Sequence, residues 1–126
     1  MKAILMILIP LTLITGMGIF YQGMLREDAD EISLRLEKLT EDVSRKNWEK
    51  ATAGLAQFNK VWQPVRFKWQ ILIDHAEVDR IDESLARIKK MISVKEQKDC
   101  LVEIAVLQQC FLHIPEKEKL SLSNIF

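Results

Sequence analysis

Apolar residues recur along most of this chain at alternating steps of three and four, the spacing that places them on one face of an α-helix. Three such seams follow one another, over residues 25–44, 47–73 and 74–92. Their apolar positions are Ala29, Ile32, Leu36, Leu39 and Val43; then Trp48, Ala51, Leu55, Phe58, Trp62, Val65, Trp69 and Leu72; then Val78, Ile81, Leu85, Ile88 and Ile92. The pattern predicts consecutive amphipathic helices with heptad-like packing faces.

The second seam crosses a proline without losing its phase. Asn47 is a favourable N-cap for this helix. Pro64 lacks the N–H donor that a helix interior needs, yet Val65 and Trp69 continue the series on the same face. We therefore expect one long, kinked helix from Asn47 to about Ile73, with two short helices as the alternative.

Capping signals mark the starts of the next two helices. Asp74 and Glu77 have the spacing of a capping box, and Ser93 with Glu96 repeats it. The last helix is apolar over a wide arc, which predicts a central position, and Pro115 should end it. Its apolar residues are Leu101, Val102, Ile104, Ala105, Val106, Leu107, Phe111 and Leu112. Short connections make successive helices antiparallel, so the predicted fold is all-α, an up-down four-helix bundle over residues 26–115.

The N-terminal segment has the length and composition of a membrane span. The 23 residues between Lys2 and Arg26 carry no charge and would form a helix of about 34 Å, enough to cross a bilayer. Tyr21 stands where an interfacial aromatic residue is common. We expect residues 1–25 to be a transmembrane signal anchor that continues into the first bundle helix. A cleaved signal peptide is the alternative.

Charges on the two sides of this segment predict its orientation. Lys2 and the N-terminus are basic, whereas "REDADE" after the apolar stretch is rich in acid. The positive-inside rule therefore favours a cytoplasmic N-terminus and a helical domain outside the cytoplasm, held at the cell membrane by a single pass.

Residues 116–126 begin with solvated charges and then become apolar again. A disordered tail rarely needs large apolar residues at its end, so we expect this segment to dock along the bundle or on a partner. The residues that would make the contact are Leu120, Leu122, Ile125 and Phe126.

The charge balance argues against nucleic acid as a partner, because Lys and Arg equal Asp and Glu at 18 each. The charges are nevertheless segregated. Residues 26–44 hold seven acidic and three basic side chains, a net charge of −4, and residues 45–70 hold six basic and one acidic, a net charge of +5. Complementary helix faces explain this pattern best, and a separate basic binding patch is the alternative.

Cys100 and Cys110 are the two cysteines of the chain. On one helix their spacing separates them by about 15 Å of rise, so they cannot form a disulfide with each other. We expect both to be buried small hydrophobic residues, with an intermolecular disulfide or a reactive thiol as alternatives.

The stretch "WQPVRFKWQILIDHAEVD" gathers the residues from which a site would be built. His75, Glu77 and Asp79, joined by His113 from another helix, are candidate metal ligands or a proton-sensing cluster. The spacing favours capping and solvated charges instead, because Glu77 does not share a helix face with His75 and Asp79. Since motifs for nucleophiles, phosphate-binding loops, metal sites and cofactors do not occur in the sequence, we expect neither an enzyme nor a bound cofactor.

Aromatic residues in the same stretch offer two further candidates. Trp62 and Trp69 lie on the packing seam, so we expect them in the core, with a ligand pocket between them and His75 as the alternative. Phe67 lies off the seam, next to the proline, and is a candidate for an exposed partner contact.

The segments "NWEKA", "LIDHAEVDRIDESLARI" and "LSLSNIF", together with the N-terminal apolar stretch, resemble the bacterial family called domain of unknown function 4363. The resemblance covers essentially the whole chain. It implies a small, single-pass helical protein of spore-forming and related Bacillota with no assigned activity. It also implies a working association with a polytopic membrane protein.

These observations favour a membrane-anchored, non-enzymatic interaction module, an accessory subunit that binds a membrane protein through Phe67, the apolar C-terminal residues and the anchor. An extracytoplasmic sensor or ligand-binding bundle is the alternative, and a metal-dependent hydrolase using the acidic residues after Ile73 is a third hypothesis. The heptad spacing also fits self-association into a homo-oligomer.

Overall fold

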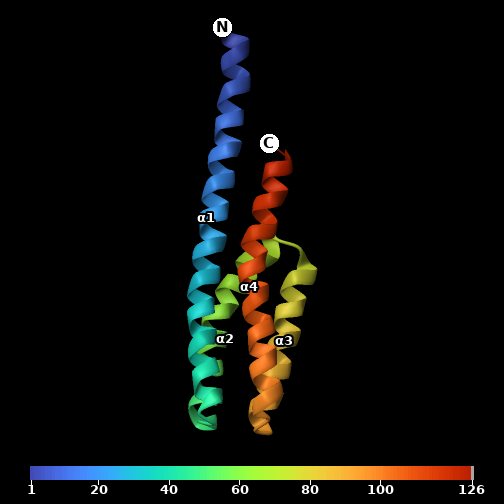
Figure 1. The fold of residues 1–126 in the computed structure, drawn as a ribbon. Helices are drawn as coiled ribbons and strands as arrows, with labels where there is room; N and C mark the ends of the chain where they lie inside the picture. The colour runs from blue at the N-terminus through green and yellow to red at the C-terminus, as the bar shows by residue number, and fades with distance from the viewer. Residues whose placement is uncertain (126) are drawn as a thin grey trace.

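The computed structural model describes residues 1–125 of the chain, with side chains for residues 1–119, and Phe126 lies outside the described residues. Four helices follow one another up and down the bundle (Figure 1): α1 Lys2–Ser44, α2 Trp48–Leu72, α3 His75–Ser93 and α4 Gln97–Ile125. Helices α1 and α3 each pack on both α2 and α4. The prediction of an all-α, antiparallel four-helix bundle is confirmed.

Helix α1 is one continuous element of 43 residues whose two halves have different surroundings. Its second half lies in the bundle, and its first half projects beyond it (Figure 1). The buried residues of the second half are Leu25, Ala29, Ile32, Ser33, Leu36, Leu39 and Val43. Among the described residues, α1 is the helix that is long and apolar enough to cross a membrane.

Helix α2 runs without a break through Pro64, so the prediction of one long helix is confirmed. Its start is capped as expected, because the Asn47 side chain accepts a hydrogen bond from the Lys50 N–H at 3.2 Å. Phe58, Trp62 and Trp69 are buried on both sides of the proline. Burial of one stripe along the whole helix offsets the hydrogen bond that the proline removes.

The predicted capping box at the start of α3 forms only in part. The Asp74 carboxylate accepts from the Ala76 N–H at 3.0 Å, which is the expected N-cap bond. The Glu77 carboxylate does not return to Asp74; it pairs with the Lys117 ammonium of α4 at 2.8 Å. A charged partner on a neighbouring helix therefore takes the acceptor that the box would have used.

The second capping box, at Ser93 and Glu96, was predicted wrongly. Ser93 is the last residue of α3, and its hydroxyl donates to the Lys90 carbonyl at 2.6 Å. Helix α4 begins at Gln97, four residues beyond the Ser93 that should have capped it. A serine in the last turn of a helix bonds backward as readily as it caps the next helix, so spacing alone did not distinguish the two.

Two further expectations for α4 are wrong. Pro115 does not end the helix, which continues to Ile125. Contacts to α1 hold the chain beyond the proline, because the Gln22 amide donates to the Pro115 carbonyl at 2.6 Å and Arg26 pairs with Glu116 at 3.2 Å. The helix is also not central, because Val102, Val106 and Leu112 are exposed. Its buried stripe is Cys100, Ile104, Leu107, Phe111 and Ile114.

Both connections at the far end of the bundle are Schellman motifs, a C-terminal cap in which one residue has a left-handed backbone. After α1, the N–H groups of Lys46 and Asn47 donate to the carbonyls of Val43 and Asp42. After α3, those of Lys95 and Glu96 donate to Ile92 and Met91. The left-handed position, usually glycine, is a lysine in each motif, with φ of 56° at Lys46 and 58° at Lys95.

Replacing either lysine by glycine should stabilise the protein. A left-handed side chain is strained, and removing the Cβ outweighs the added freedom of the unfolded chain. We expect Lys46→Gly and Lys95→Gly each to raise the free energy of unfolding by about 0.5–1 kcal/mol in urea titrations. Lys89→Gly, an exposed position inside α3, is the matched control and should lower it by about 1 kcal/mol. Equal effects at Lys46 and Lys89 would contradict the assigned strain.

Candidate functional site

Three aromatic rings form the centre of the core near the proline of α2. The Trp62 and Trp69 rings meet edge to face, with centroids 5.8 Å apart. Both also contact the ring of Phe111 from α4, at 5.4 and 5.7 Å. Trp62 is 1 % exposed and Trp69 0 %. The cluster locks the two halves of α2 to α4 through close-packed contacts.

Each buried indole donates its N–H to a carboxylate that also pairs with a cation of α2. The Trp62 N–H donates to Asp82 of α3 at 3.1 Å, and the Arg66 guanidinium binds the same carboxylate at 2.7 Å. These two bonds join α2 to α3. Asp82 lies in the first half of α3, and the structure makes it the acceptor of a core tryptophan.

The second indole repeats the arrangement on α1. The Trp69 N–H donates to Asp28 at 3.2 Å, and the Lys68 ammonium binds that carboxylate at 2.7 Å. Neighbouring tryptophan and cation positions on α2, facing an acidic α1, were the sequence signal for this network. The Lys68–Asp28 ion pair therefore joins the basic segment of α2 to the acidic segment of α1.

The predicted ligand pocket combined Trp62, Trp69 and His75. The structure places the two indoles inside the core and His75 on the surface, at the first residue of α3. Fully buried indoles present no face to a ligand in solution. An open groove instead lies between α1 and α2, at the far end of the bundle from the projecting part of α1.

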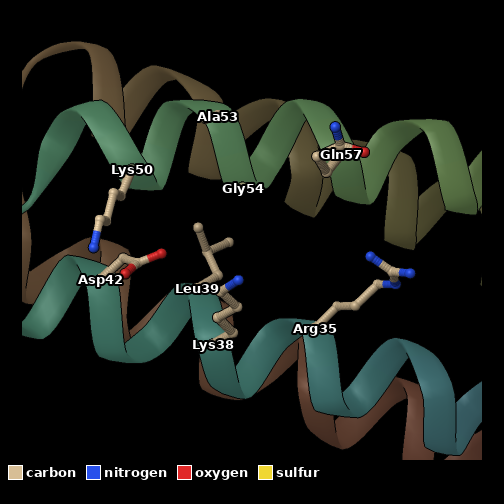
Figure 2. Close-up of a pocket in the computed structure, with 8 residues that line it drawn as sticks. All are labelled: Arg35, Lys38, Leu39, Asp42, Lys50, Ala53, Gly54 and Gln57. Atoms are coloured by element: carbon tan, nitrogen blue, oxygen red, sulfur yellow. The ribbon is translucent and has the colours of Figure 1, made fainter.

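This groove has a volume of about 410 Å³ and mixed charge (Figure 2). Its lining is Arg35, Lys38, Leu39, Asp42, Lys50, Ala53, Gly54 and Gln57. Lys50 and Asp42 face each other across one end, and Arg35 extends along the other (Figure 2). Gly54 widens the groove only slightly, since an added Cβ would lie 3.8 Å from the nearest Leu39 atom, an ordinary contact. The polar groups of the lining are three cations, the Asp42 carboxylate and the Gln57 amide.

The four candidate metal ligands do not form a common site. Glu77 is engaged by Lys117 at 2.8 Å, whereas His75, Asp79 and His113 are exposed. In the part of the chain that the structure describes, no three His, Cys, Asp or Glu residues group closely enough to hold a metal ion.

Three helices are tied together where α1 leaves the bundle. The Tyr21 hydroxyl donates to the Leu72 carbonyl at the end of α2, at 2.6 Å. Gln22 binds the Pro115 carbonyl of α4 at the same level. Burial raises the pKa of the nearby Glu118 carboxyl above its usual value, and the Tyr21 hydroxyl and Lys117 partly oppose that effect. We call this region the α1-exit end of the bundle.

Apolar side chains are exposed at the α1-exit end. Phe67 is 69 % exposed, and Ile71, one turn further along α2, is 71 % exposed. The off-seam position of Phe67 pointed to such a surface, but Ile71 was missed, although its four-residue spacing from Phe67 places both on one helix face. The backbone at Leu120, Leu122 and Ile125 is helical, and their side chains lie outside the described residues, as does all of Phe126.

The fold and its contacts define a small helical-bundle protein with an apolar N-terminal extension. The family model named Domain of unknown function (DUF4363) matches residues 19–125, and the chain belongs to this family. Comparison with curated proteins and with solved structures finds no match. The resemblance inferred from "IDHAEVDRI" and "LSLSNIF" is thereby confirmed.

Removing the Asp82 carboxylate should show how much the hydrogen bond from the Trp62 indole contributes to the stability of the fold. Asp82→Ala leaves the buried Trp62 N–H without an acceptor, and we expect a loss of about 1–3 kcal/mol in the free energy of unfolding. Asp79→Ala, an exposed carboxylate on the same helix, is the control and should change it by less than about 0.5 kcal/mol. In a Trp62→Phe background, which lacks the indole N–H, the cost of Asp82→Ala should shrink. An unchanged cost there would contradict the assigned role.

The two thiols should differ in reactivity. Burial, together with the charge of Glu103, raises the pKa of Cys100 to about 11, and its side chain is inaccessible. Cys110 is partly exposed, although burial raises its pKa as well. A disulfide reagent at pH 8 should modify Cys110 in the folded protein and Cys100 only after unfolding. Cys110→Ser should abolish the reaction of the folded protein, and rapid labelling of that variant would contradict the assigned burial.

Proposed function

We propose that the protein is a membrane-anchored, non-enzymatic interaction module, an accessory subunit of a membrane protein complex. Support for the anchor comes from α1. None of its most apolar 18 residues is buried by the rest of the described chain, and an apolar surface of that length in water would be a strong aggregation site. A bilayer provides the missing cover.

The flanking charges support the orientation. Lys2 precedes the apolar stretch, while Glu27, Asp28, Asp30 and Glu31 follow within two turns. The N-terminus is then cytoplasmic and the bundle lies outside the cytoplasm. The continuous α1 helix carries the bundle directly on the membrane surface, without a flexible linker.

The observation that carries the partner proposal is the course of α4. Beyond Glu118, which lies beside Tyr21, the helix continues for seven residues to Ile125, a further rise of about 10 Å. Figure 1 shows its end at a height partway along the apolar part of α1. With α1 in the bilayer, the end of α4 enters the outer half of the membrane.

The residues at that depth are unsuited to lipid alone. "LSLSNIF" combines apolar residues with Ser121, Ser123 and Asn124. Polar side chains of this kind inside a membrane commonly hydrogen-bond to a neighbouring helix. A membrane-embedded protein supplies such a helix, and the resemblance described above implies a polytopic partner. Leu120, Leu122, Ile125 and Phe126 then provide the apolar part of the contact.

Crosslinking and affinity recovery from the native membrane test this proposal. A tag at the N-terminus leaves the end of α4 free. We expect wild-type protein to recover an integral membrane protein in stoichiometric amount, and Leu122→Asp to lose it because a charge enters the proposed contact. Val102→Asp, an exposed position near the other end of α4, is the matched control and should retain the partner. Recovery of the chain alone, or retention of the partner by Leu122→Asp, would contradict the proposal.

A further inference from the structure

We propose that the outer face of the last turns of α2 rests on the same bilayer that α1 crosses. This surface, formed by Phe67, Ile71 and Leu72, is called the interfacial patch. The inference rests on the anchoring part of the proposed function and adds a second, peripheral membrane contact to it. The occupant is lipid, in the headgroup layer and the first carbons of the acyl chains.

The patch lies at the height along α1 where the proposed membrane boundary falls. The Tyr21 hydroxyl donates to the Leu72 carbonyl at 2.6 Å, so the end of α2 and Tyr21 lie at one level. A hydrocarbon core of about 30 Å takes up about 20 residues of helix. The uncharged stretch of α1 has 23 residues, from Ala3 to Leu25, so Tyr21 lies within a turn or so of the hydrocarbon boundary.

The patch reaches from this boundary through the headgroup layer. Leu72, 36 % exposed, lies at the level of Tyr21, and Ile71 is next to it. Phe67 lies five residues earlier, about 7.5 Å further from the membrane along α2. Headgroups occupy roughly 5–8 Å on each side of the hydrocarbon, so all three side chains lie within or at the edge of that layer.

The side chains of the interfacial patch also suit contact with lipid. Phe67 and Ile71 are four residues apart and lie on the same side of α2. An aromatic and an aliphatic side chain that are both exposed gain by burial at the boundary between headgroups and acyl chains.

The patch also selects how the bundle leans. Because α1 is continuous from the membrane into the bundle, a tilt of α1 tilts every helix packed on it. Membrane helices tilt by about 20° on average. Burial of Phe67 and Ile71 favours the direction that lowers the α2 side, so the bundle leans toward α2 and does not stand upright.

Depth-dependent quenching of tryptophan fluorescence tests the inference. The full chain is reconstituted in phosphatidylcholine vesicles containing phosphatidylglycerol, with lipids brominated close to the headgroup or deep in the acyl chain. Ile71→Trp places a reporter in the patch, and Val94→Trp, at a 58 % exposed position between α3 and α4, is the control at the opposite end. Ile14→Trp reports on α1 itself. The wild-type signal, dominated by Trp48, Trp62 and Trp69, is subtracted.

The expected result is loss of the added Ile71→Trp emission with shallow bromines, together with a blue shift, and no loss for Val94→Trp. Ile14→Trp should be quenched by deep bromines. If Ile14→Trp is quenched and Ile71→Trp behaves like Val94→Trp, the patch does not touch lipid, while the anchor and the proposed function stand. If Ile14→Trp is not quenched, the anchor fails and the patch fails with it.

A competing occupant would be a protein. A photoreactive residue at position 71, activated in the native membrane, should label lipid if the patch rests on the bilayer. Labelling of a polypeptide in place of lipid would overturn the inference and make the patch part of the partner contact. Phe67→Ser with Ile71→Ser should leave the free energy of unfolding almost unchanged, since both side chains are exposed, but should reduce quenching at a tryptophan placed at Leu72.

Discussion

Two large indoles buried beside a proline impose the constraint on which the rest of the bundle depends. Trp62 and Trp69 must each place an N–H donor inside the core, and an unpaired buried donor is costly. Asp82 of α3 and Asp28 of α1 accept these bonds at 3.1 and 3.2 Å. The requirement therefore ties α2 to both of its neighbours at the point where its own backbone hydrogen bonding is interrupted.

Most of the architecture followed from periodicity, because the buried face of a helix repeats every three or four residues whatever its neighbours are. Every seam residue from Ala29 to Val43 is buried, and the phase kept across Pro64 identified one helix. Prediction failed where tertiary contacts decide the outcome. Pro115 stays inside α4 because contacts to Gln22 and Arg26 hold the segment that follows it.

The candidate site was less accessible from the sequence. Exposure of Phe67 followed from its place off the seam, but its location relative to α1 required the bond between Tyr21 and Leu72, which joins residues 51 apart in sequence. The acceptors of the two indole N–H groups could not be predicted either, because these bonds also join residues far apart in sequence. A carboxylate near the start of a helix has the same local sequence pattern whether it is solvated or accepts from a distant donor. The end of α4 was assigned to a separate tail because a proline preceded it.

The unbroken course of α1 also sets a working distance. From Arg26 to Ser44 the helix rises about 27 Å, so with α1 anchored as proposed the Schellman connection that follows it is held at that height above the membrane boundary. A lean of about 20° displaces this point sideways by roughly 9 Å. On the proposed anchoring, α1 is a rigid spacer of fixed length, and a molecule that binds the far end of the bundle does so within a narrow range of heights above the bilayer.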